Sequence, residues 1–228
     1  MTEAERLIRS ARLFVFDFDG TLVDSNAIKF QGFDLTFEQY PAKLVEISAY
    51  CRQRNDVGRG DKFRHVYEQI LGLDYTADRA AEAYRRYAAA TTQAVIEARE
   101  IPGATAFLKA VKPRAPVALL SNTPHDVLLR ILVSRGWTEF FADICGAPVK
   151  KAAWLLNSTR ARRLPAEAVV FFGDAIEDLH AAAEAHCSFI AVASGPLAAT
   201  ALAWIADYTE LAAVFATNDA SALFKAAL

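Results

Sequence analysis

The chain has 228 residues, 54% of them apolar, which is enough to bury a sizeable core in one large domain or two modest ones. Its 25 Lys and Arg residues nearly balance 27 Asp and Glu residues, so no basic field attracts nucleic acid. The three scattered cysteines form no disulfide framework, and no apolar run reaches the roughly 20 residues that span a bilayer. We expect a soluble, cytoplasmic monomer or homodimer with no nucleic-acid or membrane partner.

Short, wholly apolar runs recur along the chain and predict strands that are buried on both faces. In chain order these runs are 13–16, 117–120, 169–172 and 189–192, and shorter candidates lie at 140–145 and 206–208. The segments 125–135, 151–163 and 177–186 have apolar residues spaced by three and four, as in helices that connect parallel strands. The pattern predicts an α/β fold with a doubly wound parallel sheet.

About a hundred residues between the first strand and Val117 break this alternation. Three stretches there have a helical pattern, 30–50, 62–71 and 77–98, with an internal loop at 55–60. We therefore expect a small helical domain, residues 26–100, inserted into an α/β core formed by residues 1–25 and 101–228. Two hinge strands, at about 22–26 and 99–103, are expected to connect them.

Acidic residues follow two of the predicted strands, at the sheet edge where open α/β folds bind ligands. Asp17 follows the first strand, and Asp174 follows the strand at 169–172. A phosphate ester is anionic, so a cation must neutralise its oxygens before a nucleophile can attack. Carboxylates suit Mg²⁺. We therefore predict that Asp17 and Asp174 hold Mg²⁺ and that Asp17 also attacks phosphorus, giving an aspartyl-phosphate.

Asp19 lies two residues beyond Asp17, so an extended backbone turns both side chains to the same side. It can protonate a departing alkoxide and later deprotonate the attacking water. Gly20 allows a sharp turn close to the phosphate. A simple turn after a strand explains Asp-Gly alone equally well. Thr21 and the matching acid at position 174 favour the catalytic interpretation.

Three segments, in this order, resemble motifs of the haloacid dehalogenase superfamily, whose members are mostly phosphatases. Residues 17–21 (Asp-Phe-Asp-Gly-Thr) closely resemble the first motif, 117–122 the second and 173–178 the fourth. The helical insert resembles the family's small cap. The chain is thus identified as similar to the helical-cap phosphatases of the phosphoglycolate phosphatase-like and beta-phosphoglucomutase-like subgroup.

The resemblance implies a role for each matching residue. Asp17 would be the nucleophile and a metal ligand, Asp19 the acid/base with its backbone carbonyl on the metal, Asp174 a further ligand, and Asp178 a residue behind the metal site. Gly20, Thr21, Ser121 and Asn122 would bind the substrate. From the residues alone, Ser121 is more simply the N-cap of a helix that begins near His125.

The family's third motif is a lysine that balances the negative charge of the carboxylates and the phosphate. Lys150 and Lys151 adjoin at the expected place. We favour Lys151, because residues 146–151 resemble a family pattern in which the lysine stands three residues after a proline, here Pro148, and begins a helix. Leu155 would then lie one turn on and face the core. A solvated lysine pair is the alternative, and it must hold for one of the two.

A cap of this family closes over the site and excludes water. Arg59 and Lys62, at the internal loop of the insert, are candidates to contact the leaving group, although each alone is more simply an exposed charge at the start of a helix. We expect a magnesium-dependent phosphatase for a small phosphorylated metabolite, a sugar phosphate or phosphoglycolate-type ester. The alternatives are a phosphomutase of the same family and, less favoured, a non-catalytic phosphate-binding protein.

Overall fold

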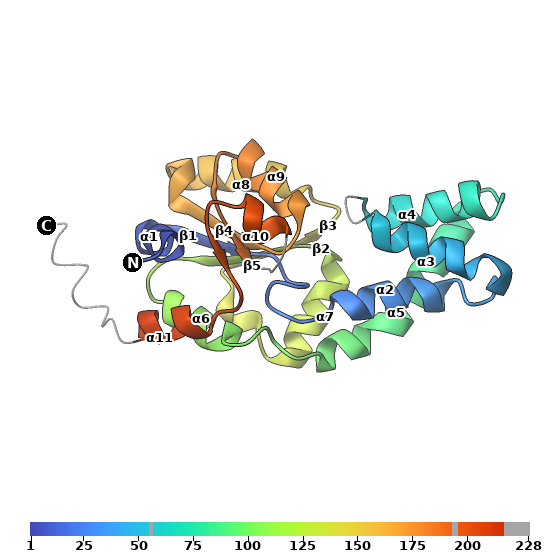
Figure 1. Cartoon of the computed structure of the whole chain (residues 1–228), viewed down its shortest axis with the longest axis horizontal. Helices are drawn as coiled ribbons and strands as arrows, with labels where there is room; N and C mark the ends of the chain where they lie inside the picture. Colours follow the sequence, from blue (N-terminus) through green and yellow to red (C-terminus); the bar gives the residue numbers. More distant parts are fainter. Residues whose placement is uncertain (55–56, 193–195, 217–228) are drawn as a thin grey trace, which may run out of the picture. The chain divides into compact units, whose positions relative to one another are not determined.

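The computed structural model describes residues 1–54, 57–192 and 196–216 (Figure 1). The chain divides into two compact units. The helical unit runs from Ser25 to Ala98, and the α/β unit consists of the segments before and after it. None of the helices in the described segments is long and apolar enough to cross a membrane.

The α/β unit is built on one parallel sheet of six strands in the order β3-β2-β1-β4-β5-β6. The strands are β1 (Leu13–Phe16), β2 (Val117–Pro124), β3 (Asp143–Ala147), β4 (Val169–Gly173), β5 (Ser188–Val192) and β6 (Trp204–Ile205). Phe16 of β1 lies opposite Leu119 of β2 and Phe172 of β4. This register brings the segments that follow these three strands to the same edge of the sheet.

Helices cover both faces of the sheet (Figure 1). They are α1 (Glu3–Ser10), α6 (Ala104–Val111), α7 (His125–Arg135), α8 (Lys151–Arg162), α9 (Ile176–Glu184), α10 (Pro196–Thr200) and α11 (Thr209–Ala216), with short turns η3 (Thr138–Phe140) and η4 (Ala166–Ala168). Leu13 and Val15 of β1 pack in one core cluster with residues of α8 and α9. Phe16 lies on the opposite face, against Phe107 of α6, as the alternation of side chains along a strand requires.

An aromatic layer covers the α6 and α11 side of the sheet. It consists of Phe16, Phe107, Phe172, Tyr208 and Phe215. The rings of Phe16 and Phe172 stack across β1 and β4 with their centroids 4.6 Å apart. Packed rings of this kind add about 0.5–1.5 kcal/mol per pair beyond the area they bury. The layer therefore supports the ends of the two strands that carry Asp17 and Asp174.

The helical unit contains α2 (Asn26–Thr36), η1 (Pro41–Lys43), α3 (Leu44–Gln53), α4 (Arg59–His65), the π-helical turn η2 (Val66–Ile70) and α5 (Ala77–Glu97). Its core is aromatic, with the rings of Phe33 and Phe37 edge-on to Phe63. Gly32 allows α2 to approach α5 closely, because a methyl group there would overlap the Thr91 methyl group and come within 3.0 Å of the Tyr87 ring.

The four longer strand predictions are confirmed, and two shorter ones need correction. The strand expected over 140–145 begins only at Asp143, because Thr138–Phe140 forms a 3₁₀ turn. The strand expected at 206–208 is wrong. The sheet instead ends with β6 at Trp204–Ile205, and the Tyr208 backbone N–H donates to the Pro102 carbonyl.

The expected hinge strands are also reduced in the structure, to a single antiparallel bridge between Val23 and Glu100. Within the insert, the pattern over 30–50 forms two helices rather than one. Pro41 begins a 3₁₀ turn between α2 and α3, as expected of a residue that cannot continue a helix. The predicted loop at 55–60 ends early, since α4 begins at Arg59, and positions 55 and 56 lie outside the described residues.

The close approach of α2 and α5 predicts that Gly32→Ala destabilises the protein. Alanine inside a helix normally stabilises by about 1 kcal/mol relative to glycine, but overpacking here should cost about 1–3 kcal/mol. Thermal unfolding monitored by circular dichroism measures the change. Thr91→Ser removes the methyl group while keeping a hydroxyl for the Tyr87 carbonyl, so Gly32→Ala should cost less in that background. A higher melting temperature for Gly32→Ala alone would refute this packing.

Candidate active site

Asp17 and Asp19 lie directly beyond the end of β1. The Asp17 N–H donates to the Phe172 carbonyl over 2.9 Å, so the backbone keeps its β4 partner one residue past the strand. Gly20 has a φ of 80°, a left-handed conformation that glycine adopts without strain, and it turns the chain. Only 6% of Asp17 and 4% of Asp19 are exposed. The two predicted carboxylates are thus buried, and they directly precede the predicted turn at Gly20.

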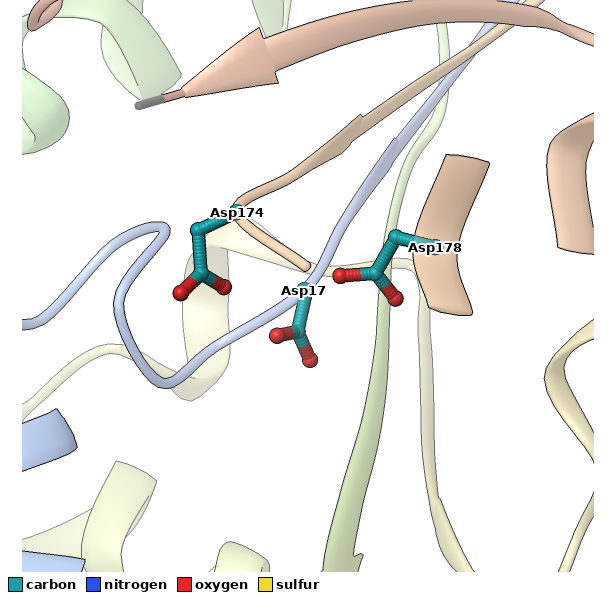
Figure 2. Close-up of side chains that lie close together, drawn as sticks. All are labelled: Asp17, Asp174 and Asp178. Carbon is teal, nitrogen blue, oxygen red and sulfur yellow. The ribbon is translucent and has the colours of Figure 1, made fainter. Parts of the chain in front are cut away.

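Asp174 and Asp178 approach Asp17 from the segment after β4 (Figure 2). Asp174 directly follows the strand, and Asp178 lies in the first turn of α9. Carboxylate oxygens of the three residues lie within 4.8 Å of one another. The Thr21 hydroxyl donates to Asp174 Oδ1 over 3.2 Å. The structure therefore brings Asp17 together with two acids that lie more than 150 residues further along the chain.

Lys151 supplies the positive charge of this cluster. It is the first residue of α8, and its Nζ lies 3.0 Å from Asp17 Oδ1 and 2.6 Å from Asp178 Oδ1. Burial alone would lower the pKa of Lys151, but the Asp17 and Asp178 carboxylates outweigh it and raise the pKa, so the ammonium stays charged. Lys150 is exposed. Of the two adjoining lysines, the structure places Lys151 in the acidic cluster.

Asp178 is fully buried, and both of its oxygens have donors. Oδ1 accepts from Lys151, and Oδ2 accepts from the Ala175 N–H over 3.3 Å. Burial raises the pKa of the Asp178 carboxyl, although Lys151 acts in the opposite direction. With Asp178 engaged in this way, the Asp17 and Asp174 carboxylates are the pair best suited to a cation, and Mg²⁺ commonly takes one or two protein carboxylates.

Ser121 and Asn122 follow the buried part of β2. The Ser121 Oγ accepts a hydrogen bond from the Thr123 N–H over 3.0 Å. The alternative that Ser121 caps a helix is wrong, because α7 begins at His125 with Pro124 at the cap position. Asn122 is exposed, and its amide lies 3.5 Å from Glu177 Oε2. Ser121 is buried and therefore held in place, whereas Asn122 faces solvent.

Thr123 is a site residue that sequence reasoning missed. Its hydroxyl donates to Asp19 Oδ2 over 2.9 Å, and both side chains are buried. The sequence pattern could have indicated this role, because residues 121 and 123 point to the same side of an extended segment. Thr123 therefore orients the carboxylate that was predicted to be the acid/base.

Arg59 and Lys62 lie on α4 of the helical unit. Arg59 stacks over the Tyr87 ring at 4.1 Å. Lys62 is only 6% exposed, and its ammonium donates to the Cys51 carbonyl over 3.0 Å and lies over the Phe33 ring. The interpretation of Lys62 as an exposed charge is therefore wrong. Contact of either residue with a substrate stays a prediction.

Comparison with known proteins shows the family to which the chain belongs. Residues 11–186 match the model of the haloacid dehalogenase-like hydrolases. A phosphoglycolate phosphatase from Psychrobacter arcticus is 26% identical over 208 residues, covering 81% of this chain and 84% of the relative. The family model matches more than half of the chain, and the chain therefore belongs to the haloacid dehalogenase-like hydrolases.

Solved structures agree with this fold. A predicted phosphoglycolate phosphatase from Haemophilus somnus superposes with a TM-score of 0.69 at 18% identity, covering 90% of this chain and 98% of its own. CbbY from Rhodobacter sphaeroides, in complex with phosphate, also gives 0.69 at 18% identity, covering 88% and 96%. The parallel sheet with its helices is therefore shared at low sequence identity.

The burial of Lys151 predicts a sharp contrast between two neighbouring lysines. Lys151→Met leaves Asp178 buried without its main donor, so it should cost about 3–5 kcal/mol of stability and at least about 10²-fold in hydrolytic rate. Lys150→Met should change stability by less than about 0.5 kcal/mol. Melting curves in EDTA and rates with an aryl phosphate measure both effects. Equal losses in the two variants would contradict the assignment.

Proposed function

We propose that the chain is a magnesium-dependent phosphatase that hydrolyses a small phosphorylated metabolite through an aspartyl-phosphate on Asp17. One observation carries this proposal: oxygens of Asp17, Asp174 and Asp178 lie within 4.8 Å of one another, with the Lys151 ammonium on Asp17. Membership of the hydrolase family and the name of the phosphoglycolate phosphatase relative support it. The enzyme is accordingly a phosphoric monoester hydrolase.

The donor set of the cluster fits Mg²⁺. The three clustered groups are carboxylates, and hard oxygen ligands are those that Mg²⁺ prefers. Asp17, Asp174 and the backbone carbonyl of Asp19 would hold the ion. The Thr21 hydroxyl on Asp174 Oδ1 fixes the orientation of that carboxylate, as outer hydrogen bonds commonly do at metal sites. When bound, Mg²⁺ neutralises the phosphoryl oxygens and so lowers the barrier to attack.

The chain's own residues carry the chemistry in two steps. In the first, an Asp17 oxygen bonds to phosphorus, the bond from phosphorus to the ester oxygen breaks, and Asp19 gives its proton to the leaving alkoxide. In the second, Asp19 takes a proton from water, which attacks the acyl phosphate, releases inorganic phosphate and restores Asp17. Lys151 keeps Asp17 in place, and Thr123 keeps Asp19 in place.

In this proposal the α/β core binds the phosphoryl group of the substrate, and the helical insert contacts the leaving group. Gly20, Thr21, Ser121 and Asn122 bind the phosphoryl group, with residues 1–25 and 101–228 as the catalytic core. The Ser121 hydroxyl accepts from Thr123, so its own proton remains to be donated to a phosphoryl oxygen.

Residues 26–100 act as the cap in this proposal, a role that rests on the family resemblance, and Arg59 and Lys62 contact the leaving group. A cap that closes over the site suits a small sugar phosphate or phosphoglycolate-type ester. All three cysteines are free thiols, in keeping with the cytoplasm, in which we place the activity.

Phosphate release from a panel of phosphorylated metabolites tests the proposal. The wild-type chain should release phosphate with Mg²⁺ and lose this activity in EDTA. Asp17→Asn should lower the rate at least about 10³-fold by removing the nucleophile, and Asp19→Asn should lower it about 10²–10⁴-fold by removing the acid/base.

Asp126→Asn is a matched control, because that carboxylate is exposed on α7 and its loss should leave the rate unchanged. Equal rates for wild type and Asp17→Asn would remove the basis of the mechanism. Dependence of turnover on a bisphosphate, with transfer back to a sugar, would indicate a phosphomutase instead.

A further inference from the structure

Tyr208 is a buried tyrosine, and the packing of its ring gives no reason for the hydroxyl group that it carries. It is the only one of the seven tyrosines outside the helical unit, and none of its surface is exposed. Its ring lies in the aromatic layer, stacked on Phe107 at 5.3 Å and tilted against Phe16 at 6.2 Å and Phe172 at 6.1 Å. A phenylalanine would fill this place equally well, so the hydroxyl must be accounted for separately.

Among the residues that the structure describes, the Tyr208 hydroxyl has no hydrogen-bond partner. A buried polar group without a partner costs about 1–3 kcal/mol. Native proteins rarely keep such a group unless an ordered water or an ion completes it.

The ring neighbours of Tyr208 place it beneath the acidic cluster. Phe16 directly precedes Asp17, and Phe172 stands two residues before Asp174. Tyr208 thus packs against the two strand residues that lie just before the predicted metal ligands. Burial raises the pKa of the Tyr208 hydroxyl, and the charges of Asp174 and Asp17 raise it further. The hydroxyl therefore stays protonated and lies within the field of both carboxylates.

We propose that Tyr208 is a positioning residue of the metal site, acting on Asp174 through one bridging water. The hydroxyl donates to the water, and the water donates to the carboxylate, so the buried hydroxyl gains a partner and Asp174 gains a donor in addition to the Thr21 hydroxyl. A water that bridges two polar groups is enthalpically nearly as favourable as a direct hydrogen bond. The consequence for metal binding rests on the magnesium site proposed above.

Binding of Mn²⁺, measured by electron paramagnetic resonance, tests this inference on the full chain. Tyr208→Phe should weaken Mn²⁺ binding about 10-fold, as loss of an outer partner of a metal ligand does. Its melting temperature in EDTA should stay close to that of the wild type, because the aromatic ring and its packing are kept. A purely structural tyrosine would give the same melting temperature with unchanged Mn²⁺ affinity.

Tyr87→Phe is the matched control. It removes a hydroxyl that donates to the Lys29 carbonyl within the helical unit, so it should lower the melting temperature and leave Mn²⁺ affinity unchanged. An affinity change below about twofold in Tyr208→Phe would overturn the inference while wild-type binding upholds the metal site. Absence of Mn²⁺ binding to the wild type would overturn both.

A second measurement needs no variant. In the wild-type chain labelled with ¹³C at the tyrosine ζ position, Mg²⁺ addition should shift the Tyr208 signal more than those of the six tyrosines of the helical unit. An unshifted Tyr208 signal in protein that binds Mg²⁺ would also overturn the inference.

Discussion

The rest of the α/β unit depends on keeping several carboxylates together in a mostly buried place. Oxygens of Asp17, Asp174 and Asp178 lie within 4.8 Å of one another, and like charges at such distances repel strongly where water is scarce. The Lys151 ammonium lies between two of them. One ammonium against three carboxylates leaves an excess of negative charge, which is the charge that the proposed binding of a divalent cation requires.

The parallel sheet holds the acidic residues and Lys151 in fixed positions. Parallel register aligns the ends of β1, β2 and β4. On one face of the sheet Lys151 of α8 contacts Asp17, and on the other the aromatic layer packs against Phe16 and Phe172, which lie just before Asp17 and Asp174. The acidic cluster is thus supported from both faces of the sheet. Hydrogen bonds from Thr21 and Thr123 orient Asp174 and Asp19. Such preorganisation lets a site act without reorganising during the reaction.

Much of this arrangement is predictable from local sequence, and the rest depends on contacts between distant segments. Continuous apolar runs predict β1, β2, β4 and β5, and the acids directly after β1 and β4 then predict where the site lies. Thr123 was missed because its partner, Asp19, is 104 residues away. The burial of Lys62 was missed because charge alone suggests exposure. It depends on the aromatic core of the helical unit and on the Cys51 carbonyl. The two-residue β6 is too short to give a pattern.

The most direct test of the central claim is chemical trapping of the phosphorylated enzyme. The chain is mixed with substrate and Mg²⁺, quenched within milliseconds and reduced with borohydride, which converts an aspartyl-phosphate into homoserine. Mass spectrometry of the tryptic peptide from Leu13 to Lys29 then locates the reduced residue. The mechanism predicts homoserine at position 17. Active enzyme that yields homoserine at position 19, or no reduced residue under conditions that trap a known aspartyl-phosphate, would contradict it.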